Sequence, residues 1–206
     1  MFACALDWPG WCRSAKDELA ALEALARSAP RYATVAAEAG FSLPGDAGER
    51  LEVAERRPGS AGTAFGVPSA IADYDARPVS AEEARRLAAF VAAAWAVFDR
   101  VAAFAPAALR KGPRGGGRDR DKIVGHVTEA GGYYAHEIGL RSTTPVAEGR
   151  AGSEPLRTAI LDILRQPSDG SPLAGRRWPV RYAAHRIAWH SIDHAWEIED
   201  RSEPTA

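Results

Sequence analysis

The chain has 206 residues, of which 46% are hydrophobic and 26% are charged, and these ordinary globular proportions exclude wholesale disorder. Its 26 basic and 27 acidic residues leave a net charge of −1, so no overall field attracts the chain to nucleic acid or to a membrane surface. The 43 alanines favour helical structure. Only five histidines and two cysteines are present, so the position of each carries information.

The first 75 residues have the pattern of a small domain that mixes strands and helices. The opening residues alternate loosely up to the turn at Trp8-Pro9-Gly10, which predicts a short strand followed by a turn. Apolar residues then recur at helical spacing over residues 16–39, where Pro30 is expected to break or kink the helix. Strand-like pieces follow at 51–54 and 63–67. We therefore predict a small α/β module, rich in βαβ connections, over residues 1–75.

The two cysteines lie close together in this module, with seven residues between Cys4 and Cys12. Two cysteines cannot build a disulfide scaffold, and these lack the Cys-x-x-Cys spacing of redox motifs. We expect them to be ordinary small apolar or turn residues. The N-terminus has no basic segment followed by an apolar stretch, so no secretory signal is expected and the predicted location is the cytoplasm.

From residue 78 onward the sequence predicts four helices. Ser80 and, three residues later, Glu83 form a capping-box pattern at the start of the first helix, which is apolar nearly all round and should be buried. Its longest apolar run, 87–98, is too short to span a bilayer. The other three helices are predicted over residues 121–138, 154–165 and 179–201. Four helices joined by the loops that lie between these ranges are typical of a four-helix bundle, which we expect over residues 78–206. With the small α/β module before it, the expected fold class is α+β.

All five histidines fall in two of these helices. His190 and His194 lie one turn apart on the inward face of the last helix, and His126 lies on the apolar stripe of the helix at 121–138. His136 and His185 lie on other faces. A histidine pair at this spacing, with a third histidine from a neighbouring helix, can hold a divalent ion and leave positions open for water or substrate. The plainer alternative is three core histidines satisfied by hydrogen bonds.

The segment around the pair does not match a zincin protease. That motif needs a glutamate directly after the first histidine to act as general base, and Ser191 occupies this position. A zincin peptidase is therefore excluded.

Residues 181–201, which contain His190-Ser191-Ile192-Asp193-His194, resemble the last helix of DinB-like metalloproteins. The segment Ile123-Val124-Gly125-His126-Val127 resembles the start of the second helix of that family. The resemblance covers about residues 78–201. It implies a four-helix bundle, often dimeric, in which His126, His190 and His194 bind a divalent metal such as Zn, Ni, Fe or Mn. Some DinB-like proteins are thiol S-transferases, which implies a low-molecular-weight thiol as substrate.

The N-terminal segment 7–22 is similar to the Pro-Gly turn and following helix of HicB-like antitoxin modules. It departs from that pattern because Trp11 intervenes before Cys12 and no DNA-binding tail follows. The resemblance implies a small interaction or scaffold module rather than antitoxin activity.

Four further residues are candidates for roles near the histidines. Glu129, one turn after His126, is a candidate fourth ligand or catalytic base, and Asp193 is a candidate for acid–base catalysis together with Glu197. Glu197 has an equally good ion-pair partner in Arg201, and we favour that structural role for it. Tyr133 and Tyr134 are candidate substrate-binding residues.

Two other features are better explained without a function. The loop over residues 110–121 holds several arginines and glycines, which could grip an anionic substrate or a nucleic-acid phosphate, but a solvated loop is the preferred interpretation. The heptad-spaced aromatics Tyr182, Trp189 and Trp196 are typical of core or dimer packing.

The histidine pattern predicts a protein that binds a divalent metal through three histidines, which could act as a hydrolase or a thiol-dependent transferase. The resemblance to DinB-like proteins implies the metal-dependent thiol S-transferase. The alternative is a non-catalytic binding or regulatory protein in which the histidines form a structural or vestigial metal site. The expected partners are a small molecule and a second copy of the chain, whereas nucleic acid and membrane are not expected.

Overall fold

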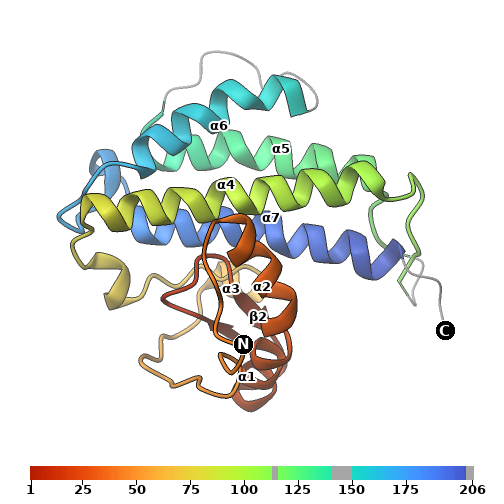
Figure 1. The fold of residues 1–206 in the computed structure, drawn as a ribbon, viewed down its shortest axis with the longest axis horizontal. Coiled ribbons are helices and arrows are strands. Elements are labelled where there is room, and N and C mark those ends of the chain that lie inside the picture. The colour runs from red at the N-terminus through yellow and green to blue at the C-terminus, as the bar shows by residue number, and fades with distance from the viewer. Residues whose placement is uncertain (113–115, 141–149, 203–206) are drawn as a thin grey trace.

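The computed structural model describes residues 1–112, 116–140 and 150–202, without the side chains of residues 150–152. The two strands form one small antiparallel sheet and all other regular elements are helical (Figure 1). The elements, in chain order, are β1 (Phe2–Cys4), β2 (Cys12–Ser14), α1 (Glu18–Arg27), α2 (Ala29–Glu38), α3 (Ala61–Ala64), the 3-10 turn η1 (Asp73–Ala76), α4 (Ala81–Phe104), α5 (Arg120–Glu137), α6 (Arg150–Leu164), the 3-10 turn η2 (Leu173–Gly175) and α7 (Val180–Ser202).

The four long helices lie side by side, with the smaller N-terminal elements against one side of them (Figure 1). Helix α4 packs against α7 and α6, and α5 packs against the same two helices, so the contacts close a ring of four. The predicted fold class, α+β with four long helices after residue 78, is confirmed at this level. The predicted helix bounds agree within about four residues, with the largest difference at the start of α6.

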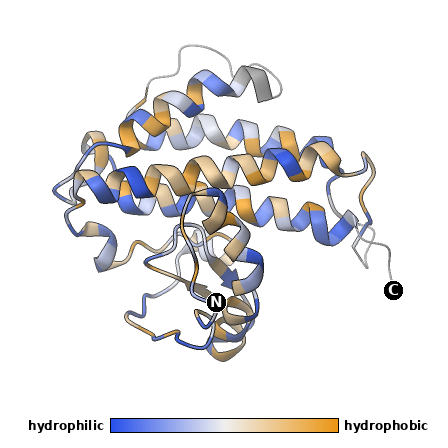
Figure 2. Ribbon diagram, in the orientation of Figure 1, coloured by the Kyte–Doolittle hydropathy of each residue, from blue (hydrophilic) through white to orange (hydrophobic). Residues whose placement is uncertain are grey.

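Helix α4 forms the middle of the core. The Ser80 side chain accepts a hydrogen bond from the Glu83 backbone N–H, as the capping pattern predicts, and Pro106 follows directly after the C-cap residue Ala105. Apolar residues occupy most of the helix (Figure 2). By length and composition alone α4 could cross a membrane, but half of its most apolar stretch is buried inside the protein. A core helix of a globular protein has the same properties.

The N-terminal strands form a hairpin rather than a βαβ unit. Strand β1 pairs antiparallel with β2, and residues 51–60 contain no strand, while Thr63 and Ala64 belong to the short helix α3. The βαβ prediction is therefore wrong. The predicted crossover needed a strand at 51–54 or 63–67, and neither segment forms one. Within the described ranges the only partner of β1 is β2, and the seven residues between them suffice for a hairpin, whereas a parallel crossover needs a dozen or more.

Pro30 separates two helices, as predicted. Helix α1 ends at Arg27 and α2 begins at Ala29, so Pro30 lies in the first turn of α2. The N–H that proline lacks has no partner within a helix at this position, so the residue starts α2 at little cost.

The two cysteines form a disulfide, which corrects the expectation of ordinary thiols. The hairpin register places Cys4 directly opposite Cys12, with their Cα atoms 4.0 Å apart. The second strand was not predicted, and without it this pairing could not be anticipated. Disulfides are rare in the cytoplasm, so this bond does not support the predicted cytoplasmic location.

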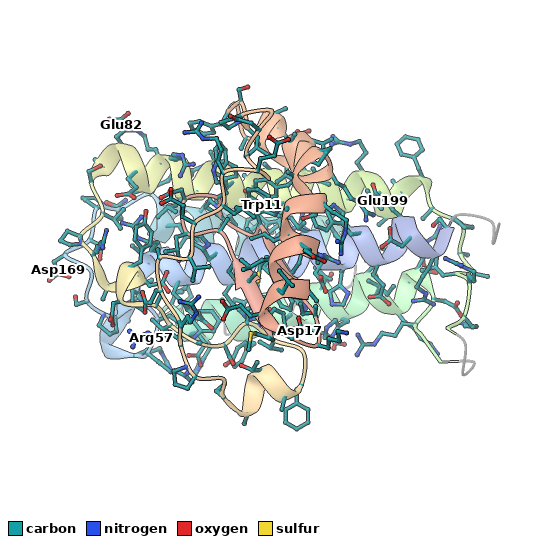
Figure 3. The ribbon with its side chains drawn as sticks, turned by 90° about the horizontal axis from the view of Figure 1, so that it is seen from below. Trp11, Asp17, Arg57, Glu82, Asp169 and Glu199 are labelled. Carbon is teal, nitrogen blue, oxygen red and sulfur yellow. A yellow bond between two sulfur atoms is a disulfide. The ribbon has the colours of Figure 1, made fainter. Side chains whose placement is uncertain are left out.

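The buried side chains of the N-terminal part are continuous with those of the four helices. Tyr32 of α2 stacks on Trp11 at 5.4 Å and on Phe90 of α4 at 6.4 Å between ring centroids, and its hydroxyl donates to the Pro9 carbonyl. Figure 3 shows the N-terminal elements, including Trp11, lying across α4 and α7. The division into two domains near residue 76 remains a prediction.

His185 of α7 lies at this junction, near the backbone of Leu6. Its Nε2 atom is buried and has no hydrogen-bond partner among the described residues. Burial first, and then the charge of Arg181, lowers the pKa of His185 to about 4. This histidine is therefore held neutral at neutral pH.

We expect His185 to destabilise the metal-free protein on acidification. In the unfolded chain a histidine has a pKa of about 6.5, so below that pH the unfolded state binds a proton that the folded state does not, and the free energy of unfolding falls as the pH falls. Between pH 6.5 and pH 4.5 the contribution is about 2 kcal/mol. Asp75, whose pKa burial raises to about 6, acts in the opposite direction, so the variant must be compared with the wild type. Urea unfolding gives the free energy of unfolding of wild type and of His185→Gln at each pH in this range. The difference between the two free energies should change by about 2 kcal/mol, and a constant difference would contradict the prediction.

Candidate metal centre

Three histidines from two neighbouring helices converge on one point. His126 comes from α5, and His190 and His194 come from α7, which packs against α5. Each histidine contributes one ring nitrogen, and these three nitrogens lie within 4.8 Å of one another. The Nε2 atoms of His126 and His190 are 3.2 Å apart. The three residues predicted from the helical faces therefore lie close enough to bind one metal ion.

Apolar packing on both sides of the histidines holds the two helices together. On α5 the residues Ile123 and Val127, which flank His126, are buried, and on α7 the residues Ile187 and Ala195 are buried around the pair. His190 is only 6% exposed, whereas His126 and His194 are half-buried. The cluster is thus anchored in the core through His190 and is accessible from the side of the other two.

Burial keeps the imidazoles of His126 and His190 in the neutral form that binds metals. Desolvation, followed by the charge of His194, lowers the pKa of His126, and desolvation lowers the pKa of His190 to about 2. A neutral imidazole has one nitrogen lone pair free for a metal. At neutral pH these two side chains therefore need no deprotonation before they bind an ion.

Glu197 orients the third histidine. Its carboxylate accepts a hydrogen bond from His194 Nδ1 at 2.8 Å and a second from Arg201 Nη1 at 2.7 Å. The hydrogen bond from His194 is the main reason that the pKa of Glu197 is lowered. With Nδ1–H engaged, the lone pair of His194 is on Nε2, as in metal sites where a carboxylate fixes the ligating tautomer. The ion pair with Arg201 was predicted, but the contact with His194, three residues earlier on the helix, was missed.

One of the three nitrogen–nitrogen separations matches a tetrahedral metal site. Two nitrogens bound to zinc at about 2.0–2.1 Å in tetrahedral geometry are about 3.3 Å apart, close to the separation of the His126 and His190 Nε2 atoms. A direct hydrogen bond between the two imidazoles would give a similar distance, and it would use one of the lone pairs that a metal needs. Imidazole suits zinc, copper, iron and nickel, so the three histidines can hold a divalent ion without selecting its identity.

We expect Glu197→Gln to weaken Zn²⁺ binding by about 10-fold, because an outer partner of a ligand is typically worth 10–100-fold and the amide still accepts a hydrogen bond without carrying charge. The matched control is Glu199→Gln on the same helix, since Glu199 pairs with Arg31. Competition with a chromophoric chelator measures both affinities. Equal affinities for the two variants would show that Glu197 does not support the site.

The other candidate residues are distributed around the cluster. Tyr134 is buried and its ring contacts that of His190 edge-on, 5.5 Å between centroids, whereas Tyr133 is 56% exposed and contacts Trp178. Glu129 is exposed on α5. The substrate-binding and catalytic roles assigned to these residues remain predictions.

Asp193 connects the hairpin to the helix that carries the two histidines. Its carboxylate pairs with Arg13 of β2 at 3.2 Å, and burial raises its pKa. This ion pair supplies a structural role for Asp193 that the sequence pattern did not reveal. Its proposed part in catalysis remains a prediction.

The arginine- and glycine-rich loop contacts the C-terminal end of α7. The described part of the loop, together with Glu197 and Arg201, lines a cavity of about 370 Å³. The backbone N–H of Arg110 donates to the Arg201 carbonyl, and Lys111 pairs with Asp119. Residues 113–115 of this loop lie outside the described part of the chain. Most of the described loop residues are exposed, which agrees with the predicted solvated loop, and the hydrogen bonds to Arg201 connect it to the end of α7.

The two remaining histidines lie outside the cluster, as the face analysis predicts. His136 is exposed on α5, where its ring contacts Arg176, and His185 faces the hairpin. One residue beside the cluster was missed entirely: Arg186 lies one turn before His190, over the rings of Tyr134 and Trp189.

Comparison of the chain with protein-family models, curated proteins and solved structures finds no significant match to any of them.

Proposed function

We propose that this chain is a DinB-like metalloprotein whose His126, His190 and His194 bind one catalytic divalent ion. The observation that carries the proposal is the convergence of three imidazole nitrogens within 4.8 Å of one another. The short resemblance of residues 181–201 to the last helix of that family, and the ring of contacts among α4, α5, α6 and α7, support the family assignment. Zn, Ni, Fe and Mn are all compatible with such a ligand set.

The protein would bind the ion through residues that are largely fixed in advance. His190 is locked in the core, and Glu197 fixes the tautomer of His194 through its hydrogen bond with Nδ1. Three protein ligands leave a fourth tetrahedral position open, as in catalytic rather than structural zinc sites. When bound, a divalent ion supplies Lewis acidity that lowers the pKa of a coordinated water or thiol.

The reaction that we propose is transfer of a low-molecular-weight thiol to an electrophilic small molecule. The family resemblance supports thiol transfer, and the open position supports activation of either a thiol or a water, so ester hydrolysis is the second candidate. Tyr134, whose ring contacts His190, would line the substrate pocket. We further propose that the chain acts as a homodimer, which sedimentation equilibrium tests directly.

The first experiment measures the metal content. Protein purified without a chelator or a metal-affinity tag should hold close to one equivalent of a divalent metal, or take up one equivalent of Zn²⁺, Ni²⁺, Fe²⁺ or Mn²⁺ after removal of the native ion. Content well below one equivalent that no metal restores would overturn the proposal.

The second experiment separates the enzyme from a non-catalytic binding protein. The loaded protein is assayed with a panel of thiols and electrophiles and with a panel of esters, in parallel with His190→Ala. Turnover that disappears in the variant supports the enzyme. Loss of thermal stability in the variant, with no turnover by either protein, would instead assign the histidines a structural role.

A further inference from the structure

Arg186 forms no ion pair and no hydrogen bond with a carboxylate in the part of the chain that the structure describes, although the charge of Asp193, two turns later on α7, acts on it from a distance. Its Nη1 atom is buried and makes no hydrogen bond to the described residues. The guanidinium carbon lies 4.6 Å from the centre of the Trp189 ring and 5.3 Å from that of Tyr134. Two aromatic rings therefore hold the charged group in place, and neither supplies an oxygen acceptor to Nη1.

Three other ring-stacked arginines have an oxygen acceptor within the protein, and for Arg86, over Phe90, this is the Asp7 backbone carbonyl. Arg157 lies over Trp95 and pairs with Asp99, and Arg181 lies over Tyr74 and pairs with Glu83. A buried charged donor that lacks an acceptor is costly, so proteins normally provide the acceptor themselves. At Arg186 the chain positions the donor and leaves the acceptor to come from elsewhere.

A second donor beside Arg186 is also unsatisfied. The indole Nε1 of Trp189 is buried and has no hydrogen-bond partner among the described residues. The guanidinium lies over this same indole ring, so the two groups that carry the free donors are neighbours. Two neighbouring donors without acceptors, one of them charged, match an oxyanion that has several acceptor atoms.

These two groups adjoin the three-histidine cluster. Arg186 precedes His190 by four residues on α7, so their Cβ atoms are about 5–6 Å apart on one helical face. The rings of Tyr134 and Trp189, which contact Arg186, also contact the His190 ring, with centroids at 5.5 and 6.1 Å.

We propose that Arg186 and Trp189 form an oxyanion-binding site beside the metal centre, and that it takes a carboxylate or phosphate group of the substrate. This inference rests on the proposed function for the identity of the ligand as a substrate, but the donors themselves belong to the protein without the ion. Arginine presents parallel N–H groups that match the two oxygens of a carboxylate or a phosphate. The substrate class is therefore a small anionic molecule rather than a neutral one.

The test measures the binding of acetate and of inorganic phosphate to the complete chain by isothermal titration calorimetry, in the metal-free state and after loading with Co²⁺. We expect one equivalent of at least one of these anions to bind, and Arg186→Gln to weaken it by at least about 10-fold, the effect of losing a hydrogen bond to a charged group. The anion affinity of Arg186→Lys should fall between those of the wild type and Arg186→Gln, because lysine keeps the charge but lacks the parallel N–H groups of the guanidinium. The two probes distinguish a carboxylate site from a phosphate site.

Arg165→Gln is the matched control, since Arg165 is exposed just after the end of α6 and the substitution changes the net charge by the same amount. It should leave anion binding unchanged, and thermal unfolding and Co²⁺ affinity of Arg186→Gln verify that this variant folds. Equal anion affinity in wild type and Arg186→Gln, or no binding of either anion to the wild type in either state, would overturn the inference and assign the free donors to water only. A different result separates the two proposals. If the wild type binds no metal, but binds the anion and Arg186→Gln does not, the proposed function fails and the oxyanion site stands.

Discussion

Replacing His126 with alanine is expected to lower the affinity for Zn²⁺ or Co²⁺ by more than about 100-fold. The side chain supplies one of the three nitrogens at the cluster, and its loss should exceed the 10–100-fold effect typical of an outer partner of a ligand. His126 is half-buried, so truncation disturbs the core less than the same change at His190 would. Competition titration against a chelator of known affinity gives the ratio directly.

The control for this prediction lies on the same helix. His136→Ala removes an exposed imidazole from α5, outside the cluster, and should leave the affinity unchanged. A similar loss of affinity in both variants would mean that the effect comes from the helix as a whole. Unchanged affinity in His126→Ala would remove this residue from the site.

Gly10→Ala is expected to destabilise the protein by about 2–5 kcal/mol. Gly10 has a φ of +86°, and a Cβ atom added there would lie 2.9 Å from the Ala188 carbonyl carbon and 2.6 Å from the end of the Ile192 side chain. The left-handed conformation costs a residue with a Cβ about 1–2 kcal/mol, and forcing extra volume into a packed region adds about 1–3 kcal/mol. Urea unfolding of the metal-free protein measures the sum.

Gly40→Ala separates the two contributions. Gly40 has nearly the same φ, +84°, but no atom lies within 4 Å of the added Cβ. It should lose only about 1–2 kcal/mol, the cost of the backbone conformation. An equal loss in the two variants would mean that the hairpin is not packed tightly on α7.

The long helices could be predicted because their signals are local. Ser80 and Glu83 mark the start of α4, and Pro106 lies just beyond its end. The three histidines could be predicted for the same reason, since a helical wheel places His190 and His194 on one face without knowledge of the fold. His126 faces them because α5 packs beside α7. The apolar stripe around His126 correctly indicated that this side of α5 is turned toward the other helices.

The features that the sequence did not predict are contacts that depend on parts of the chain far apart in sequence. The pairing of Cys4 with Cys12 depends on a three-residue strand, β2, that is too short to give a clear alternation. The pairing of Asp193 with Arg13 joins residues 180 positions apart, and no local pattern indicates it. Arg186 was missed because its significance lies in the absence of an acceptor among the described residues, which a sequence does not reveal.

The contact between Glu197 and His194 is a different case. The two residues are three positions apart on a helix, so their spacing was sufficient to suggest a hydrogen bond. The more familiar pattern, Glu197 with Arg201 at four positions, predicts an ion pair and gives no indication of a second partner. The structure shows that one carboxylate serves both, since its two oxygens accept from different side chains.

The central claim is that His126, His190 and His194 bind a single divalent ion. Its most direct test is a crystal structure of the zinc-loaded protein with data collected on both sides of the zinc absorption edge. We predict one anomalous peak about 2.0–2.1 Å from a ring nitrogen of each of the three histidines. A map with no peak at this position, from crystals grown with an excess of Zn²⁺ at neutral pH, would contradict the claim.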